Sequence, residues 1–201
     1  MNLSLVENHF IPKSILDIGA NVGQFFKQAS YKWPEADIFS IEANEECEIY
    51  LKGLTKNYKI CLLAKDNNNY DYYKRLSHAE GATGNSIYKE LTTFFSEGKY
   101  ETKNLPGTTL DELVGNKTYD LIKLDTQGSE LDIISGGLNV VNRCKALLIE
   151  VTLHTPYNKN APLYEDVVKF LENLNFEETE ILATHSGLAD QKDILFLNKN
   201  L

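Results

Sequence analysis

The 201-residue sequence contains few cysteines, and they are not clustered. Cys47, Cys61 and Cys144 lie far apart and form neither a Cys-x-x-Cys pair nor a Cys/His cluster. This spacing predicts neither a disulfide framework nor a structural zinc site, and it is typical of reduced thiols in a cytosolic protein.

Basic residues and long apolar runs are also scarce. Lys and Arg number 20 against 29 Asp and Glu, which gives a net charge of −9 with no basic cluster. Nucleic-acid binders usually present a basic face to phosphates, so a nucleic-acid partner is not expected. No apolar stretch approaches the roughly 20 residues of a membrane span. The N-terminus lacks the pattern of a signal peptide, and we expect a cytoplasmic protein.

Strand-like and helix-like patterns alternate along the chain, which predicts an α/β layer fold in one domain, residues 1–201. Residues 1–13 form a short N-terminal extension, and residues 66–107, which have weak periodicity, form an insertion expected on the substrate side. Asn44 and Ser129 are expected to cap helices. Strands are predicted at residues 14–18, 37–41, 58–63, 119–124, 146–151, 176–182 and 193–197.

The first predicted strand-to-helix turn, residues 17–23 (DIGANVG), has the character of a cofactor loop. Glycines allow a sharp turn and a close approach of a ligand to the backbone. Asp17 stands where a dinucleotide loop would have glycine, and its carboxylate would repel a pyrophosphate. It suits S-adenosylmethionine, which carries a sulfonium and an ammonium. The cofactor-binding residues predicted here are Asp17, Gly19, Ala20, Asn21 and Gly23.

A second acid, Glu42, ends the next predicted strand. An acid at this place can accept hydrogen bonds from ribose hydroxyls, which indicates an adenosine ligand but does not by itself separate S-adenosylmethionine from NAD. Ala43 follows it, and Ala64 ends the third strand, next to the expected position of the adenine. We therefore add Glu42, Ala43 and Ala64 to the cofactor-binding residues.

Two later strand ends bring further polar side chains to the same edge. Asp125 and Gln127 follow the strand at 119–124, and both are predicted to contact the cofactor. Glu150 lies in an apolar run, where a carboxylate is costly without a partner or a role. Glu150 and His154, with Asp125 behind them, are the candidate catalytic bases. No dense carboxylate/His cluster is evident in the sequence, so no metal is predicted.

These segments together resemble the FkbM-type S-adenosylmethionine-dependent methyltransferases. The resemblance rests on residues 15–25 (ILDIGANVGQF), 41–44 (IEAN), 84–88 (GNSIY), 109–113 (TLDEL) and 120–131 (DLIKLDTQGSEL), with weaker matches at 149–151 and 193–197. It implies a Rossmann-like class I methyltransferase fold. Such a fold has a mostly parallel seven-stranded sheet, helices on both faces and an antiparallel last strand.

The resemblance also implies O-methylation of a sugar, a glycan or a related metabolite, with S-adenosyl-L-homocysteine as the second product. Two alternatives stay open. A nicotinamide-dependent oxidoreductase would share Gly19 and Glu42, although Asp17 and Asn21 oppose it. A non-catalytic adenosine-binding module would keep the cofactor edge without a base. The sequence identifies neither the acceptor nor the oligomeric state.

Overall fold

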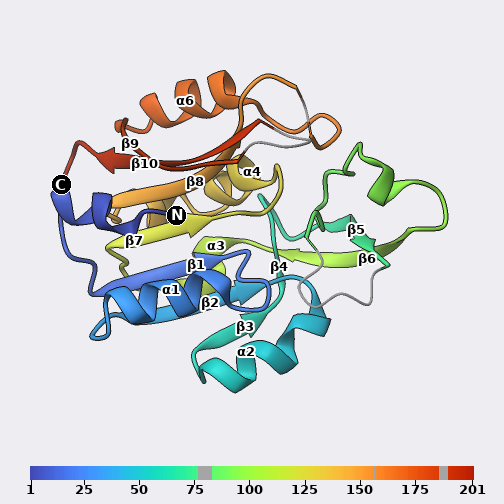
Figure 1. The fold of residues 1–201 in the computed structure, drawn as a ribbon, viewed down its shortest axis with the longest axis horizontal. Helices are drawn as coiled ribbons and strands as arrows, with labels where there is room; N and C mark the ends of the chain where they lie inside the picture. The colour runs from blue at the N-terminus through green and yellow to red at the C-terminus, as the bar shows by residue number, and fades with distance from the viewer. Residues whose placement is uncertain (77–82, 156, 186–189) are drawn as a thin grey trace.

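The computed structural model describes residues 1–76, 83–155, 157–185 and 190–201. A seven-stranded sheet runs through the molecule in the order β3-β2-β1-β7-β8-β10-β9 (Figure 1). Strand β10 is antiparallel to both of its neighbours, whereas the other adjacent pairs are parallel. The predicted seven-stranded, mostly parallel sheet with an antiparallel last strand is confirmed.

The elements follow the predicted alternation. The strands of the large sheet are β1 (Ser14–Ile18), β2 (Asp37–Glu42), β3 (Tyr58–Ile60), β7 (Leu121–Leu124), β8 (Ala146–Thr152), β9 (Phe176–His185) and β10 (Gln191–Asn198). The α-helices are α1 (Gln24–Lys32), α2 (Glu48–Leu54), α3 (Leu110–Val114), α4 (Glu130–Ser135), α5 (Leu138–Val141) and α6 (Tyr164–Glu172). Short 3-10 helices are η1 (Leu3–Asn8), η2 (Glu45–Cys47) and η3 (Thr93–Phe95).

Two hydrophobic clusters cover the two faces of the large sheet. Because side chains alternate along a strand, Leu16 and Ile18 of β1 pack in the cluster that contains residues of α3, α4, α5 and α6. Ile15 points to the opposite face and packs with residues of η1 and α1, among them Phe25. Both faces are thus buried under helices, which explains the nearly continuous apolar runs of the central strands.

The prediction of one continuous strand over residues 58–63 is wrong. Its first half is β3, but Cys61 interrupts it, and β4 (Leu62–Leu63) belongs to a separate three-stranded sheet. The Cys61 amide donates to the carbonyl oxygen of Glu42, after which Leu62 pairs with Gly107 of β6. An apolar run does not indicate which sheet each half joins, so the break was not visible in the sequence.

Residues 66–107 contain most of this smaller sheet, whose strands β5 (Asn69–Arg75) and β6 (Tyr100–Thr108) form an antiparallel pair beside the ends of the large sheet (Figure 1). Residues 77–82 of this segment lie outside the described residues. The assignment of residues 66–107 as a substrate-side insertion, and of residues 1–13 as an extension, stays a prediction.

The two predicted helix caps have different outcomes. Asn44 accepts a hydrogen bond from the Glu46 amide at 3.2 Å and caps η2, as expected. Ser129 precedes α4, but its hydroxyl donates to the Thr126 carbonyl oxygen at 3.2 Å and does not cap the helix. Glu130 instead satisfies the backbone N–H donors of this turn, because its carboxylate accepts from the amides of Thr126 and Gly128.

Candidate active site

A row of polar residues crosses the α1 face of the sheet near the carboxyl ends of its parallel strands. In β1, Ile15 and Asp17 point to the same face, two residues apart. The register places Asp17 beside Ser40 of β2 and Lys123 of β7, and Asp193 of β10 opposite Glu150 of β8. The alternation of strand side chains therefore collects these polar groups above the α1-side core.

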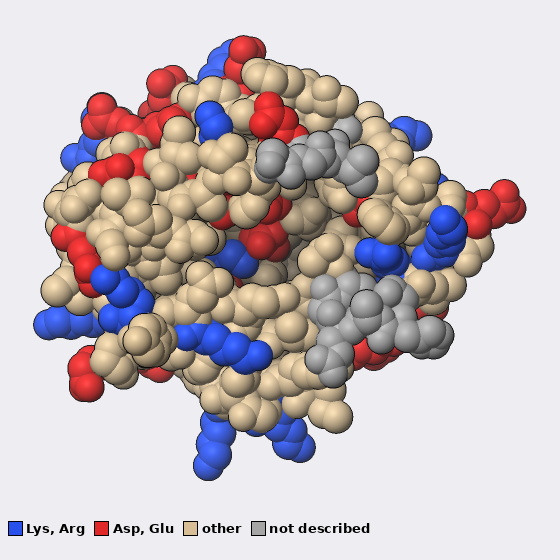
Figure 2. Space-filling model, in the orientation of Figure 1, with Lys and Arg blue, Asp and Glu red and all other residues tan. Residues whose placement is uncertain are grey.

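A cavity of about 430 Å³ opens at this edge. Figure 2 shows the hollow near the middle of the face, where acidic atoms gather with a basic group beside them. The predicted residues that line it are Gly19, Ala20, Asn21, Glu42, Asp125, Gln127 and Glu150. Other lining residues are Gln24, Phe25, Gln28, Asn85, Lys123, Tyr157, His185, Gln191 and Asp193.

Gly19 forms the tight turn that shapes one wall of the cavity. Its φ of 77° lies in the left-handed region, and a Cβ built there would stand 1.9 Å from the Asp125 carbonyl oxygen. The amides of Gly19 and Ala20 both donate to the Ile41 carbonyl oxygen, at 2.9 and 3.0 Å. Only glycine combines a left-handed φ with the absence of a Cβ. Packing against Asp125 therefore requires glycine at this point of the predicted loop, whether or not a ligand is bound.

Glu42 lies at the cavity wall, 8% exposed, and supports two turns. One carboxylate oxygen accepts from the Asn21 amide at 2.8 Å, and the other accepts from the Asn44 amide at 2.7 Å. Burial raises the pKa of this carboxyl, and the two backbone donors act in the opposite direction. Each oxygen keeps acceptor capacity beyond its backbone bond, because an ionised carboxylate offers about four lone-pair sites.

A smaller, mostly apolar cavity of about 60 Å³ adjoins the large one. The two cavities share Gly19, Glu42, Asn85 and Asp125. The smaller one is lined further by Ile18, Ile41, Ala43, Cys61, Leu62, Leu63, Tyr72, Ser86, Ile87, Thr126, Ser129 and Ile133. Its mostly apolar lining suits a flat ring system. A polar group attached to that ring would lie beside Glu42, which both cavities share.

Lys123, which sequence reasoning missed, is the buried cation of the site. Its ammonium lies 3.6 Å from an Asp17 oxygen and 3.2 Å from an Asp125 oxygen, and it donates to the Gly19 carbonyl oxygen at 3.3 Å. Burial opposes its charge, but Asp125 and Asp17 outweigh burial and raise the pKa of Lys123. Burial raises the pKa of Asp17, and Lys123 opposes that shift. The ammonium thus links the first turn to the end of β7.

Glu150 and Asp125 are joined through an amide. Gln127 donates to Asp125 at 2.9 Å and to Glu150 at 2.6 Å, and Gln191 donates to the same Glu150 oxygen at 3.1 Å. Burial, followed by the nearby Asp125 and Asp193 carboxylates, raises the pKa of Glu150 well above its usual value. For Asp125, burial acts in the same direction, but Lys123 and Gln127 outweigh it and lower the pKa.

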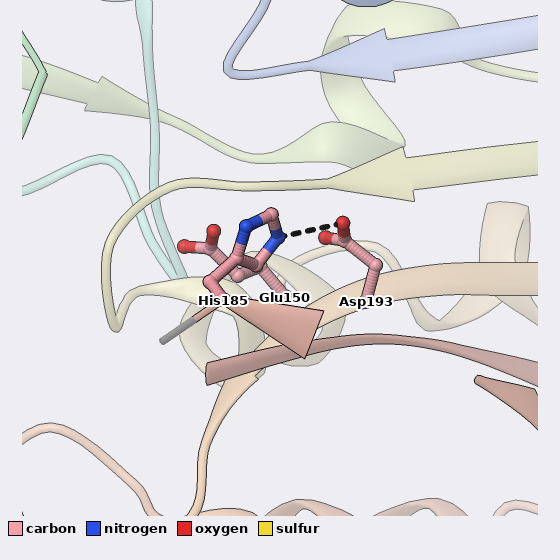
Figure 3. A group of neighbouring side chains, drawn as sticks. All are labelled: Glu150, His185 and Asp193. Atoms are coloured by element: carbon pink, nitrogen blue, oxygen red, sulfur yellow. Dashed lines mark hydrogen bonds and ion pairs between the residues drawn. The ribbon is translucent and has the colours of Figure 1, made fainter. Parts of the chain in front are cut away.

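His185 and Asp193 form a hydrogen-bonded pair beside Glu150 (Figure 3). His185 Nε2 and Asp193 Oδ2 are 2.9 Å apart. One ligand-type atom from each of Glu150, His185 and Asp193 lies within 4.8 Å of the others. These atoms are engaged with protein groups, since His185 and Asp193 bond to each other and Glu150 Oε2 accepts from Gln127 and Gln191. The absence of a metal from the site stays a prediction.

Four predicted site residues are not among the residues that line either cavity. Asp17 is fully buried beneath Lys123, and Ala64 is fully buried with its amide bonded to the Thr108 carbonyl oxygen. A Cβ at Gly23 would meet the Leu54 side chain. The His154 side chain is 81% exposed, 4.0 Å from an Asp190 oxygen.

The missed lining residues carried weak signals in the sequence. Lys123 and Asp193 lie inside predicted strands. The alternation of strand side chains does not distinguish a site residue there from any other polar position. His185 and Gln191 approach the site only because β9 and β10 pair in a specific register. A single sequence does not reveal this register, nor the two irregularities that follow further along the β9–β10 pairing.

Solved structures with the same fold are methyltransferases. The chain matches a methyltransferase FkbM from Methylobacillus flagellatus KT (TM-score 0.57, 13% identity), covering 92% of this chain but 43% of that one. It matches magnesium protoporphyrin IX methyltransferase (ChlM) from Synechocystis PCC 6803 with bound SAM at TM-score 0.55 and 10% identity, covering 97% and 74%. A TehB-like SAM-dependent methyltransferase from Corynebacterium glutamicum matches with a TM-score of 0.50 and 12% identity. The match covers 93% of this chain and 80% of that one.

The fold is therefore that of the class I methyltransferases. The family model for the methyltransferase FkbM domain matches residues 17–178, and the chain belongs to this family. Membership makes S-adenosylmethionine the methyl donor of the site and excludes the nicotinamide oxidoreductase alternative. Among curated proteins, none matches the sequence. No helix formed by the described residues is long and apolar enough to cross a membrane.

Proposed function

We propose that this chain is an O-methyltransferase that modifies a hydroxyl of a sugar, a glycan or a related metabolite. The observation that carries the proposal is the 430 Å³ cavity, which reaches from Glu42 on the first half of the sheet to Glu150 and Gln191 on the second. One side has the groups that an adenosine needs. The other offers hydrogen-bond donors and acceptors for an acceptor molecule.

The residues of the first half fit the methyl donor. Glu42 has the remaining acceptor capacity to bind ribose hydroxyls, and the smaller apolar cavity beside it suits the adenine ring. Asp125 and Gln127 stand beyond the Gly19 turn, where a carboxylate and an amide suit the ammonium and carboxylate of the donor's amino-acid part. When bound, the donor would supply a methyl group on a cationic sulfur.

The second half of the cavity favours a neutral hydroxylated acceptor. Amide and carboxylate side chains line it, and Gln191 bridges Glu150 and, at 3.5 Å, the Thr152 hydroxyl. The Cys47 thiol also lines the cavity, but burial raises its pKa to about 12, which keeps it from acting as a thiolate at neutral pH. The net charge of −9 disfavours polyanionic acceptors such as RNA.

The predicted catalytic residues differ in how well they fit. Asp125 and Glu150 line the cavity, whereas His154 points to solvent outside it. Asp125 is ion-paired with Lys123, and its lowered pKa makes it a poor proton acceptor. We therefore propose that Asp125 positions the donor, and that most of the rate comes from holding the acceptor oxygen in line with the methyl group.

Two measurements test the function. Calorimetric titration should show binding of S-adenosylhomocysteine and none of NAD. Incubation with S-adenosylmethionine and a panel of neutral glycosides should then release S-adenosylhomocysteine with at least one of them. Binding without turnover on any hydroxylated acceptor would favour the non-catalytic adenosine-binding module. Preferred methylation of RNA over every glycoside would show that the acceptor class is wrong.

A further inference from the structure

We propose that His185 is the general base that takes the proton of the acceptor hydroxyl, and that Asp193 positions its imidazole. The inference rests on the proposed function and assigns the proton acceptor of that reaction to a residue outside the sequence-based candidates. Both residues line the large cavity, at the end where the acceptor groups lie. They come from the last strand pair, β9 and β10 (Figure 3).

The geometry of the pair is that of an oriented base. The Asp193 side chain is 6% exposed and fixed within β10, whereas the His185 side chain is 47% exposed. The 2.9 Å contact between Nε2 and Asp193 Oδ2 pairs an ionised Asp193 with the tautomer in which Nε2 carries the proton, and this tautomer leaves the lone pair on Nδ1. A buried acid that holds one ring nitrogen leaves the other to accept a proton, and partial exposure lets that proton escape to solvent.

Several charged groups surround this pair. Glu150 lies opposite Asp193 on β8, and Asp125 and Lys123 of the β7 end act on Asp193 through their charges. Gln191, the strand partner of His185, is neutral and bonds to Glu150. The ring therefore lies among hydrogen-bonded polar groups that hold its orientation.

Glu150 is less suited to the same role. One of its oxygens already accepts from the Gln127 and Gln191 amides, at 2.6 and 3.1 Å. Burial and the neighbouring Asp125 and Asp193 carboxylates raise its pKa well above the usual value. Glu150 thereby orients the two amides along the acceptor side, and proton removal falls to the histidine.

The proposed step is balanced in atoms and charge. The hydroxyl oxygen forms the new bond to the donor methyl carbon as the carbon–sulfur bond breaks and leaves its electron pair on sulfur. The hydroxyl proton passes to Nδ1 of His185. The products are the methyl ether, neutral thioether sulfur and an imidazolium, which returns its proton to solvent.

The first arm of the test needs no acceptor. Nitrogen-15 NMR reports the tautomer of each of the four histidines of the chain, and the H185Q variant identifies the signals of His185. We expect neutral His185 to carry its proton on Nε2, and D193N to convert it into a mixture of tautomers. A proton on Nδ1 in the wild-type protein, or no effect of D193N, would overturn the proposal.

The second arm measures S-adenosylhomocysteine release with the glycoside panel as a function of pH. H185Q should lower turnover by about 10²–10⁴-fold and abolish the rise of rate with pH, with the affinity for S-adenosylhomocysteine unchanged. D193N should lower turnover, because the imidazole loses the partner that orients it, and D193E should restore turnover in part. H9Q is the matched control, since His9 is paired with Glu180 at 3.4 Å and is not among the cavity residues.

The outcomes separate this inference from the proposed function. Wild-type turnover combined with an unaltered rate and pH profile in H185Q refutes the base while the methyltransferase assignment stands. A rate that depends on added Mg²⁺ and disappears with a chelator also refutes it, because a metal would then acidify the hydroxyl. If the wild-type protein binds S-adenosylhomocysteine but methylates no glycoside, the proposed function fails and the NMR arm decides the His185 tautomer alone.

Discussion

Replacing Glu42 by Gln tests the proposed binding of the donor's ribose at Glu42. The two side chains have the same shape, but Gln has one acceptor oxygen where Glu has two. The carboxylate accepts from the Asn21 amide at 2.8 Å and from the Asn44 amide at 2.7 Å. The amide of Gln has one acceptor oxygen, so one backbone N–H would face an NH₂ group. An unsatisfied buried donor costs about 1–3 kcal/mol.

Both stability and affinity should therefore fall in E42Q. In a domain of this size each kcal/mol lowers Tm by about 2–4 °C, so a decrease of roughly 2–12 °C is expected. Loss of a charge-assisted hydrogen bond to the ribose costs about 1.5–3 kcal/mol, which raises the Kd for S-adenosylhomocysteine roughly 10- to 140-fold. Differential scanning calorimetry and isothermal titration measure the two effects separately.

E45Q is the matched control for this variant. The Glu45 side chain is 71% exposed and forms only a surface ion pair with Lys103, whose loss should cost at most about 1 kcal/mol. Its affinity for S-adenosylhomocysteine should stay at the wild-type value. An E42Q protein with the Tm and the Kd of the wild type would refute both roles of Glu42.

Three further predictions concern the rest of the site. G19A should abolish binding of S-adenosylhomocysteine and lower Tm sharply, because its Cβ would stand 1.9 Å from the Asp125 carbonyl oxygen. K123M should lower the free energy of unfolding by about 3–5 kcal/mol in urea titration, because it leaves the buried Asp17 carboxylate without its ion pair. Relative to wild type, E150Q should become more stable as pH rises above the usual pKa of a Glu carboxyl, about 4.3. The raised pKa of Glu150 in the folded protein means that its ionisation disfavours the folded state.

Each of these has a contradicting result. Wild-type affinity in G19A would mean that the turn tolerates a side chain and that the close approach to Asp125 is not required. For Lys123, the double variant K123M/D17N should recover part of the lost stability, and no recovery would show that the Asp17 pair is unimportant. A stability difference between E150Q and wild type that is constant with pH would show that Glu150 does not ionise above its usual range.

The fold followed from the sequence where periodicity and glycine chemistry act locally. The apolar runs of β1, β7 and β8 and the Gly19 turn predict parallel strands with a ligand edge, and they are found there. The break at Cys61 was not predictable, because β4 leaves the large sheet to pair with β6, more than forty residues later in the chain. Pairing over such a separation is a tertiary effect that local propensity does not contain.

Several residues predicted for the site line one cavity, but a sequence does not show how deeply each of them is buried. Asp17 was expected at the ligand, yet it is fully buried, with one carboxylate oxygen 3.6 Å from the Lys123 ammonium. Glu42 was expected only as a ribose-binding acid at a strand end, but its two backbone bonds also tie it to both neighbouring turns. His154 attracted attention as a polar residue after β8, whereas the register of β9 and β10 brings a different histidine, His185, to the cavity.

Methyl transfer itself is the most direct test of the account. The protein is incubated with S-adenosylmethionine that carries a trideuterated methyl group and with the panel of neutral glycosides, and the products are analysed by mass spectrometry. We expect a trideuteromethyl ether formed in equal amount to S-adenosylhomocysteine. Tight binding of S-adenosylhomocysteine with no labelled product from any glycoside would contradict it.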